Sequence, residues 1–151
     1  MKAFNVYVQS LLEYYCSVWS PHLMCLMNCT EGVQRNYTEK LRGIGNLSYD
    51  ERLKIPNTDR LEIRRIKFDL VLYYKMINND VDMDTYDFFE FLNTVIRGHQ
   101  FKLRINHSKN HKFLNSFCNR SVHIWTSLTS SIVTCSSIAA FKRKLKSANL
   151  F

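Results

Sequence analysis

The chain has 151 residues, 46% of them hydrophobic and 13% aromatic, which excludes a disordered chain and allows one domain with its own core. Its four glycines and two prolines leave few helix breakers, so we expect a mainly α-helical fold. The formal net charge is +8, and it is distributed unevenly along the chain. No stretch of the sequence approaches the roughly 20 consecutive apolar residues that a membrane-spanning helix needs.

Apolar residues recur at helical spacing over residues 3–15, which predicts a first helix. A second helix is predicted over residues 20–41, because Pro21 suits the first helical position. Ser48 and Glu51 then form a capping-box pattern, in which each side chain satisfies a backbone amide of the other. A short helix should follow Ser48.

The clearest helix is predicted over residues 59–77, where apolar side chains form one continuous stripe. Arg64 and Arg65 fall largely outside that stripe and are expected to face solvent. Another short helix is predicted over residues 84–92.

The hydrophobic period changes after Gly98. Residues 101–105 alternate between apolar and basic side chains, which is typical of a strand, and residues 112–117 can return as its partner. The fold expected is therefore a helical domain with a small β-hairpin around residues 100–118. Helices over residues 116–128 and after Ser137 complete it.

Acidic residues stop at Glu90. Residues 1–90 carry 11 basic and 13 acidic side chains, whereas residues 91–151 carry ten Lys or Arg, four of the five His and no Asp or Glu. This asymmetry suits a polyanion such as RNA or DNA, bound in a salt-sensitive and sequence-tolerant way. The candidate nucleic-acid-binding residues are Arg64, Arg65, Arg97, His99, Lys102, Arg104, Lys109, Lys112, Arg120, Lys142, Arg143, Lys144 and Lys146.

Two alternatives to nucleic-acid binding remain open. The basic stretch also fits a solvated surface, and its aromatic residues Phe101 and Trp125 lie on predicted apolar faces, which favours core packing over base stacking. The chain would then be a helical packing module that meets another protein through an apolar face.

The five cysteines are odd in number and irregular in spacing, and no secretory signal precedes them, so we expect reduced thiols in the nucleus or cytoplasm. Cys16, His22, Cys25 and Cys29 offer a metal-binding alternative, but they lack the paired C-x-x-C spacing of a zinc site. No phosphate-binding loop or nucleophilic triad is recognisable in the sequence. We therefore expect no catalytic site, cofactor or small-molecule substrate.

Several short motifs follow one another in a recognisable order. Residues 12–22 read LEYYCSVWSPH, residues 33–38 VQRNYT, residues 47–53 LSYDERL, residues 61–65 LEIRR and residues 96–99 IRGH. Asn119-Arg120 precedes WTSL at residues 125–128, and Phe141-Lys142 closes the series. Together they resemble the region that follows the polymerase domain in jockey-like non-LTR (LINE) retrotransposon reverse transcriptases, from about Val6 to Leu145.

The resemblance implies a thumb-like helical part over residues 1–92 and a basic part over residues 93–151, holding template and primer beside a catalytic palm. The sequence departs from the family pattern at Asn36, where a second Arg is usual, and at Thr129, where Pro is usual. The family's palm carries an adjacent pair of aspartates, and this sequence contains no Asp-Asp pair. We therefore expect a truncated, non-catalytic piece of an RNA-directed DNA polymerase, whose partners are nucleic acid and a palm supplied from elsewhere.

Overall fold

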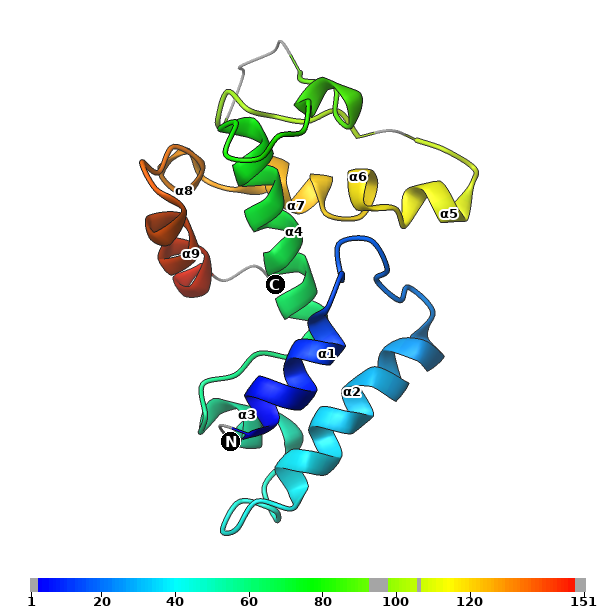
Figure 1. The fold of residues 1–151 in the computed structure, drawn as a ribbon, viewed down its shortest axis with the longest axis vertical. Coiled ribbons are helices and arrows are strands. Elements are labelled where there is room, and N and C mark those ends of the chain that lie inside the picture. The colour runs from blue at the N-terminus through cyan, green and yellow to red at the C-terminus, as the bar shows by residue number, and fades with distance from the viewer. Residues whose placement is uncertain (1–2, 93–97, 106, 149–151) are drawn as a thin grey trace. The chain divides into compact units, whose positions relative to one another are not determined.

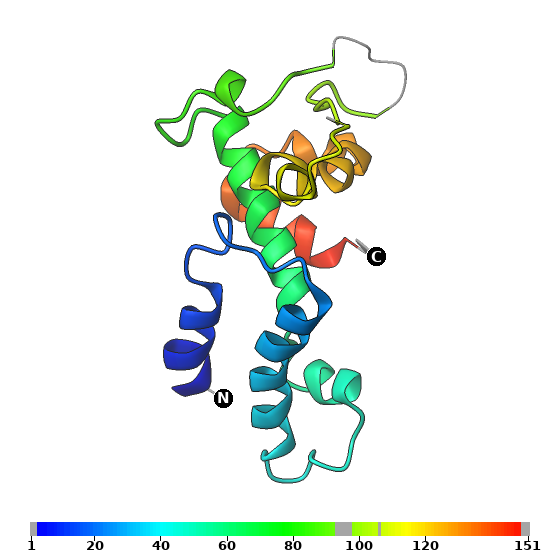
Figure 2. The same cartoon turned by 90° about the vertical axis from the view of Figure 1, so that its right-hand side faces the viewer.

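The computed structural model describes residues 3–92, 98–105 and 107–148. As predicted from composition, these residues are mainly helical. The chain divides into two compact units, Met1–Ile66 and Lys67–Phe151. Figures 1 and 2 show the helices of each unit. The boundary between these units falls within helix α4 (Leu61–Ile77). The two parts expected from the sequence, residues 1–92 and 93–151, instead follow the change in charge.

The first unit begins with a helix, as predicted, but its first six residues form a π-helix, η1 (Phe4–Gln9), which continues into α1 (Ser10–Glu13). The second helix, α2 (Met24–Glu39), begins later than expected. Ser20 and Pro21 precede it, and Leu23 is the N-cap residue with extended backbone angles. The proline therefore lies in the loop between α1 and α2 and not in the first turn.

The capping box predicted at Ser48 is confirmed. The Glu51 side chain accepts the Ser48 amide at 3.0 Å, the Ser48 hydroxyl accepts the Glu51 amide, and α3 (Tyr49–Lys54) follows. These hydrogen bonds to Ser48 lower the pKa of the Glu51 carboxyl.

Glu31 of α2 connects the remaining helices of the first unit. One of its carboxylate oxygens accepts the amide of Leu61, the first residue of α4, at 3.0 Å, and the other accepts the Tyr49 hydroxyl. Gln34 is buried beside it and donates to the Asp59 carbonyl at 3.1 Å. An acidic side chain thus satisfies a free amide at the start of α4, where helix-terminal amides favour negative charge.

The core of the second unit is aromatic. The predicted stripe on α4 is buried at Leu70, Tyr73 and Tyr74, and Tyr73 packs edge-to-face on Trp125 while Tyr74 stacks on Phe141. Trp125 and Phe141 are fully buried, which confirms the packing role expected for Trp125. Such ring pairs add to the free energy gained from burying apolar area.

The predicted hairpin around residues 100–118 is wrong. Within the described residues there is no strand, only an isolated antiparallel bridge between Phe91 and Leu103. Residues 101–105 do extend, but their backbone partner is the segment before Leu92, with Leu92 N donating to Lys102 O at 2.9 Å. The expected return strand forms a helical turn instead, α5 (His111–Leu114), because the Asn110 side chain caps it by accepting the Lys112 amide.

Two other helices differ from expectation. Residues 84–92 form only a short 3-10 turn, η2 (Thr85–Asp87), because the chain then extends to pair with residues 102–104. The helix expected over residues 116–128 is divided into α6 (Phe117–Arg120) and α7 (Val122–Ser127). The break falls at Ser121, whose buried hydroxyl donates to Asp69 at 3.1 Å.

The chain ends in α8 (Ser130–Val133), which was not predicted, and α9 (Ile138–Ser147), which was. Ser137 caps α9 by accepting the Ala140 amide at 3.2 Å. None of the helices in the described segments is both long enough and apolar enough to cross a bilayer.

Candidate nucleic-acid interface

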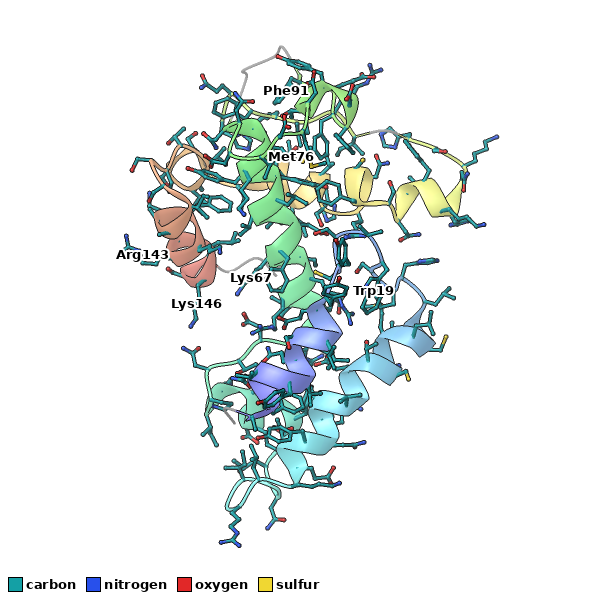
Figure 3. All side chains as sticks on the ribbon, in the orientation of Figure 1. Trp19, Lys67, Met76, Phe91, Arg143 and Lys146 are labelled. Atoms are coloured by element: carbon teal, nitrogen blue, oxygen red, sulfur yellow. The ribbon has the colours of Figure 1, made fainter. Side chains whose placement is uncertain are left out.

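Within the described residues, helix α9 carries the densest group of exposed cations. Its apolar residues Phe141 and Leu145 are buried, which turns Lys142, Arg143 and Lys146 toward solvent. Figure 3 shows Arg143 and Lys146 extending away from the helix. We call Lys142, Arg143 and Lys146 the α9 cations. Their exposure agrees with the side of the helix on which the sequence pattern placed them.

Lys144 is exposed as well, but its ammonium donates to the Ser131 carbonyl in α8. This contact directs its charge toward the protein backbone. Lys144 therefore links α8 to α9 in addition to contributing positive charge.

Lys109 and Lys112 form a second exposed group, next to the Asn110 cap of α5. His107 and His111 flank them and are also exposed. Figure 1 shows α5 and α9 well apart within the second unit. Among its described residues, the second unit thus has separate cationic groups at α5 and α9 and not one continuous stripe.

Several predicted binding residues are already engaged by carboxylates. Arg64 forms a two-point ion pair with Glu13, and Arg104 pairs with Glu90 at 2.8 Å. The Arg104 pair is exposed on both sides and is worth little in water, so a phosphate can compete for it. Arg64 is mostly covered and is held in place by its partner.

Arg120 has a structural role. Its guanidinium donates to both oxygens of Asp69, at 2.7 and 2.8 Å, and the carboxylate is almost completely buried. Burial, and after it the charge of Asp69, raises the pKa of the neighbouring Tyr73 hydroxyl. A buried two-point pair of this kind fixes α6 on α4 and does not present a cation to a ligand.

Arg65 and His99 are buried, contrary to expectation. Only 3% of Arg65 is exposed, and its guanidinium lies 5.5 Å from the centre of the Trp19 ring; burial lowers its pKa. His99 is 2% exposed, and its Nε2 hydrogen bonds to the Trp125 carbonyl at 3.0 Å. Burial lowers the pKa of His99, so the neutral ring is favoured.

The remaining predicted residues are Lys102 and Arg97. Lys102 is half-buried, and the end of its side chain lies beside Gly98. The φ of Gly98 is 93°, in the left-handed region that residues with a side chain rarely adopt. Arg97 lies outside the described residues.

Sequence reasoning missed a concentration of cations around one ring in the first unit. The guanidinium groups of Arg35, Arg52 and Arg60 lie 5.1, 5.7 and 5.8 Å from the centre of the Tyr49 ring. The LSYDERL motif showed the local helix start, but the approach of Arg35 and Arg60 depends on tertiary packing. Burial and the Glu31 hydrogen bond raise the pKa of the Tyr49 hydroxyl, which therefore stays protonated.

The proposed soft-metal ligands are not gathered. Cys16 is buried while Cys25 and Cys29 are exposed on α2, and none of the three is joined in a disulfide. Across the described part of the chain, no group of three or more His, Cys, Asp or Glu side chains is placed to hold a metal ion.

Comparison with known proteins adds one relative. An uncharacterized protein from Caenorhabditis elegans is 32% identical over 82 residues, which make up 52% of this chain and 41% of that protein. The chain thus matches less than half the length of that relative. No model of a known protein family matches the chain, and no solved structure matches it.

Proposed function

We propose that this chain is a non-catalytic, sequence-tolerant nucleic-acid-binding part of a non-LTR retrotransposon reverse transcriptase. In this proposal it contacts the phosphates of RNA, DNA or a template–primer duplex, and the polymerase chemistry belongs to a separate palm. The ordered motifs from residues 12 to 142 support the family, and the helical fold is consistent with a thumb-like region.

The observation that carries the binding proposal is the face of α9. Phe141 and Leu145 anchor the helix in the core, so Lys142, Arg143 and Lys146 are held on the opposite side within two helical turns. Neither α8 nor α9 contains an acidic residue, so these cations have no carboxylate on their own or the preceding helix. Cations in this arrangement neutralise phosphates and release counterions on binding.

The test measures affinity for a labelled single strand and a labelled duplex at several salt concentrations. We expect the logarithm of the binding constant to fall linearly with the logarithm of the salt concentration. Replacing the three α9 cations by Gln should reduce the magnitude of that slope by roughly 2, since each phosphate contact contributes about 0.7 to 0.9.

A matched control removes the same charge from the first unit. Lys40, Arg42 and Lys54 are exposed there, and replacing them by Gln also changes the net charge by three. If the control variant and the α9 variant weaken binding equally, the effect is one of net charge and the α9 proposal is wrong. A binding constant that does not respond to salt would contradict the proposal as a whole.

A specific observation favours a second function, that of a helical packing module. Several large apolar side chains on η1, α1 and α2 are more than 40% exposed, including Tyr7 at 71%, Leu11 at 73% and Met24 at 69%. Exposed apolar residues of this extent are usual at protein contacts. Light scattering of the purified chain tests this, and a monomer at all concentrations removes self-association as the explanation.

A further inference from the structure

The loop between α1 and α2 displays three aromatic rings on a fixed backbone. Tyr14, Tyr15 and Trp19 are 66%, 62% and 42% exposed, and the Tyr14 and Tyr15 rings meet edge-to-face with centres 4.5 Å apart. Figure 3 labels Trp19 on this loop. We call these three residues the aromatic loop.

The rings are exposed although hydrogen bonds hold the backbone of the loop in place. The Trp19 indole Nε1–H donates to the Tyr14 carbonyl at 2.6 Å, and the amides of Val18 and Trp19 both donate to the Tyr15 carbonyl at 2.9 and 3.1 Å. Cys16 is buried within the loop and anchors it. Tyr15 has a φ of 50°, in the left-handed region that side chains other than glycine seldom adopt. Strained backbone of this kind persists where the surrounding contacts enforce it, and it is concentrated at functional sites.

Trp19 is supported by a cation. The guanidinium of Arg65 lies over its ring, 5.5 Å from the ring centre, and 42% of Trp19 is still exposed. Arg65 is almost completely buried, with 3% of its surface exposed. Its Nε and Nη2 atoms have no hydrogen-bond partner among the described residues. Cys16 and the carboxylates of Glu31, Glu13 and Glu62 also interact electrostatically with this guanidinium.

The charges around the aromatic loop suit a phosphate-bearing ligand. Residues 14–30 contain no Asp, Glu, Lys or Arg, and Glu13, the nearest carboxylate before them, is neutralised by Arg64. The Arg65 guanidinium, which lies over the Trp19 ring, places a positive charge next to the loop. Exposed flat rings are a sequence-tolerant platform for unpaired bases, since every base offers a π-face.

We infer that the aromatic loop is a stacking site for unpaired bases of single-stranded RNA or DNA, with Trp19 as its main platform. The inference rests on the proposed function and sharpens its substrate class, because duplexes keep their bases stacked internally. Phosphate contacts at the α9 cations should be common to single strands and duplexes, whereas stacking at Trp19 should favour single strands.

The chain's two tryptophans make the inference testable by fluorescence, because Trp19 is exposed and Trp125 is fully buried. Titration with a short oligothymidylate should quench Trp19 emission saturably, and a duplex of equal length should quench it little. Trp19→Ala should weaken single-strand binding about 5- to 100-fold and leave duplex affinity unchanged, from the energy of stacking one base on one ring. Trp19→Phe keeps an aromatic platform and should retain most of the affinity while the quenching signal disappears.

A second variant guards against a folding defect. Tyr14→Ala removes an exposed ring without removing the carbonyl that accepts the Trp19 indole, so circular dichroism should stay unchanged while single-strand affinity falls.

Salt-dependent binding without quenching, and with equal affinity for single strands and duplexes, would overturn the stacking inference and leave the α9 proposal intact. Quenching that persists after the α9 cations are replaced, with an unchanged salt slope, would support stacking and overturn the α9 proposal. A concentration-dependent blue shift of Trp19 without any oligonucleotide would assign the loop to contact with a second copy and overturn the inference.

Discussion

In the interior of the second unit, Asp69 accepts hydrogen bonds from the Arg120 guanidinium at both of its carboxylate oxygens and from the Ser121 hydroxyl. The Asp69 side chain is 1% exposed and that of Arg120 is 14% exposed. A pair buried to this degree contributes little net stability compared with an apolar pair of the same shape, but removing one partner leaves an uncompensated charge.

Asp69→Asn is therefore expected to lower the free energy of unfolding by about 3 to 5 kcal/mol, measured by urea denaturation. The double variant Asp69→Leu/Arg120→Met should recover most of that loss, because it leaves no buried charge unpaired. Asp82→Asn, at an exposed position, is the control and should change stability by less than about 0.5 kcal/mol. Equal stability of the Asp69→Asn variant and the control would show that the pair is not buried in solution.

His99 makes stability depend on pH at the residue scale. Because its pKa in the folded chain lies below the usual 6.5, the unfolded chain binds the proton more readily. Its contribution is fully present above pH 6.5 and is lost as the pH falls from there through the lowered folded pKa.

We expect the free energy of unfolding to decrease between pH 7.5 and pH 5.5, and His99→Gln to flatten that decrease. Urea denaturation at roughly five pH values measures both. His123→Gln, at an exposed position of α7, should keep the wild-type slope. A wild-type slope in the His99→Gln variant would mean that other groups account for the pH dependence.

At the scale of the element, the sequence predicted the features that depend only on residues close together in the chain, such as helix caps. The Ser48 capping box and the Ser137 cap were both recognisable, because each needs residues only three positions apart. The alternation at residues 101–105 correctly indicated extended backbone, but its partner could not be predicted. Trp125 and Thr126 of α7 donate to the carbonyls of Phe101 and Leu103, which satisfies groups that a return strand would have used.

The same limit applies to the candidate site. Exposure of the α9 cations followed from helical spacing, whereas the burial of Arg65 and the pairing of Arg120 depend on residues about 50 positions away in the sequence. No local pattern distinguishes a paired arginine from an exposed one.

Replacing Ser48 by Ala tests the capping box as an element-scale feature. The loss of the cap should lower the free energy of unfolding by about 1 kcal/mol, measured by urea denaturation followed by circular dichroism. Thr129 is the N-cap of α8 but makes no capping hydrogen bond, so Thr129→Ala is a matched control with a smaller expected effect. Equal losses in the two variants would contradict a specific role for the Ser48 hydroxyl.

At the scale of the whole molecule, charge is divided unequally between the two units. The first unit carries nine basic and seven acidic side chains, a net charge of +2, and the second carries twelve and six, a net charge of +6. Polyanions should therefore be drawn mainly to the second unit.

Hydrogen exchange with and without bound nucleic acid checks this distribution along the chain. A duplex should slow exchange in α9 and around α5, where the exposed cations lie, and should leave residues 14–19 unchanged. A single strand should additionally slow exchange at residues 14–19. Protection spread evenly over both units would contradict the charge argument.

The Asp69–Arg120 pair also restricts how related sequences can diverge. A change at either position alone strands a charge in the interior, so an intermediate with one partner replaced folds poorly. Relatives under selection for a folded product should therefore keep both residues or have exchanged both for an apolar pair. Genomic copies that drift without selection should lose one partner independently of the other, so coupled change at these two positions separates maintained copies from decaying ones.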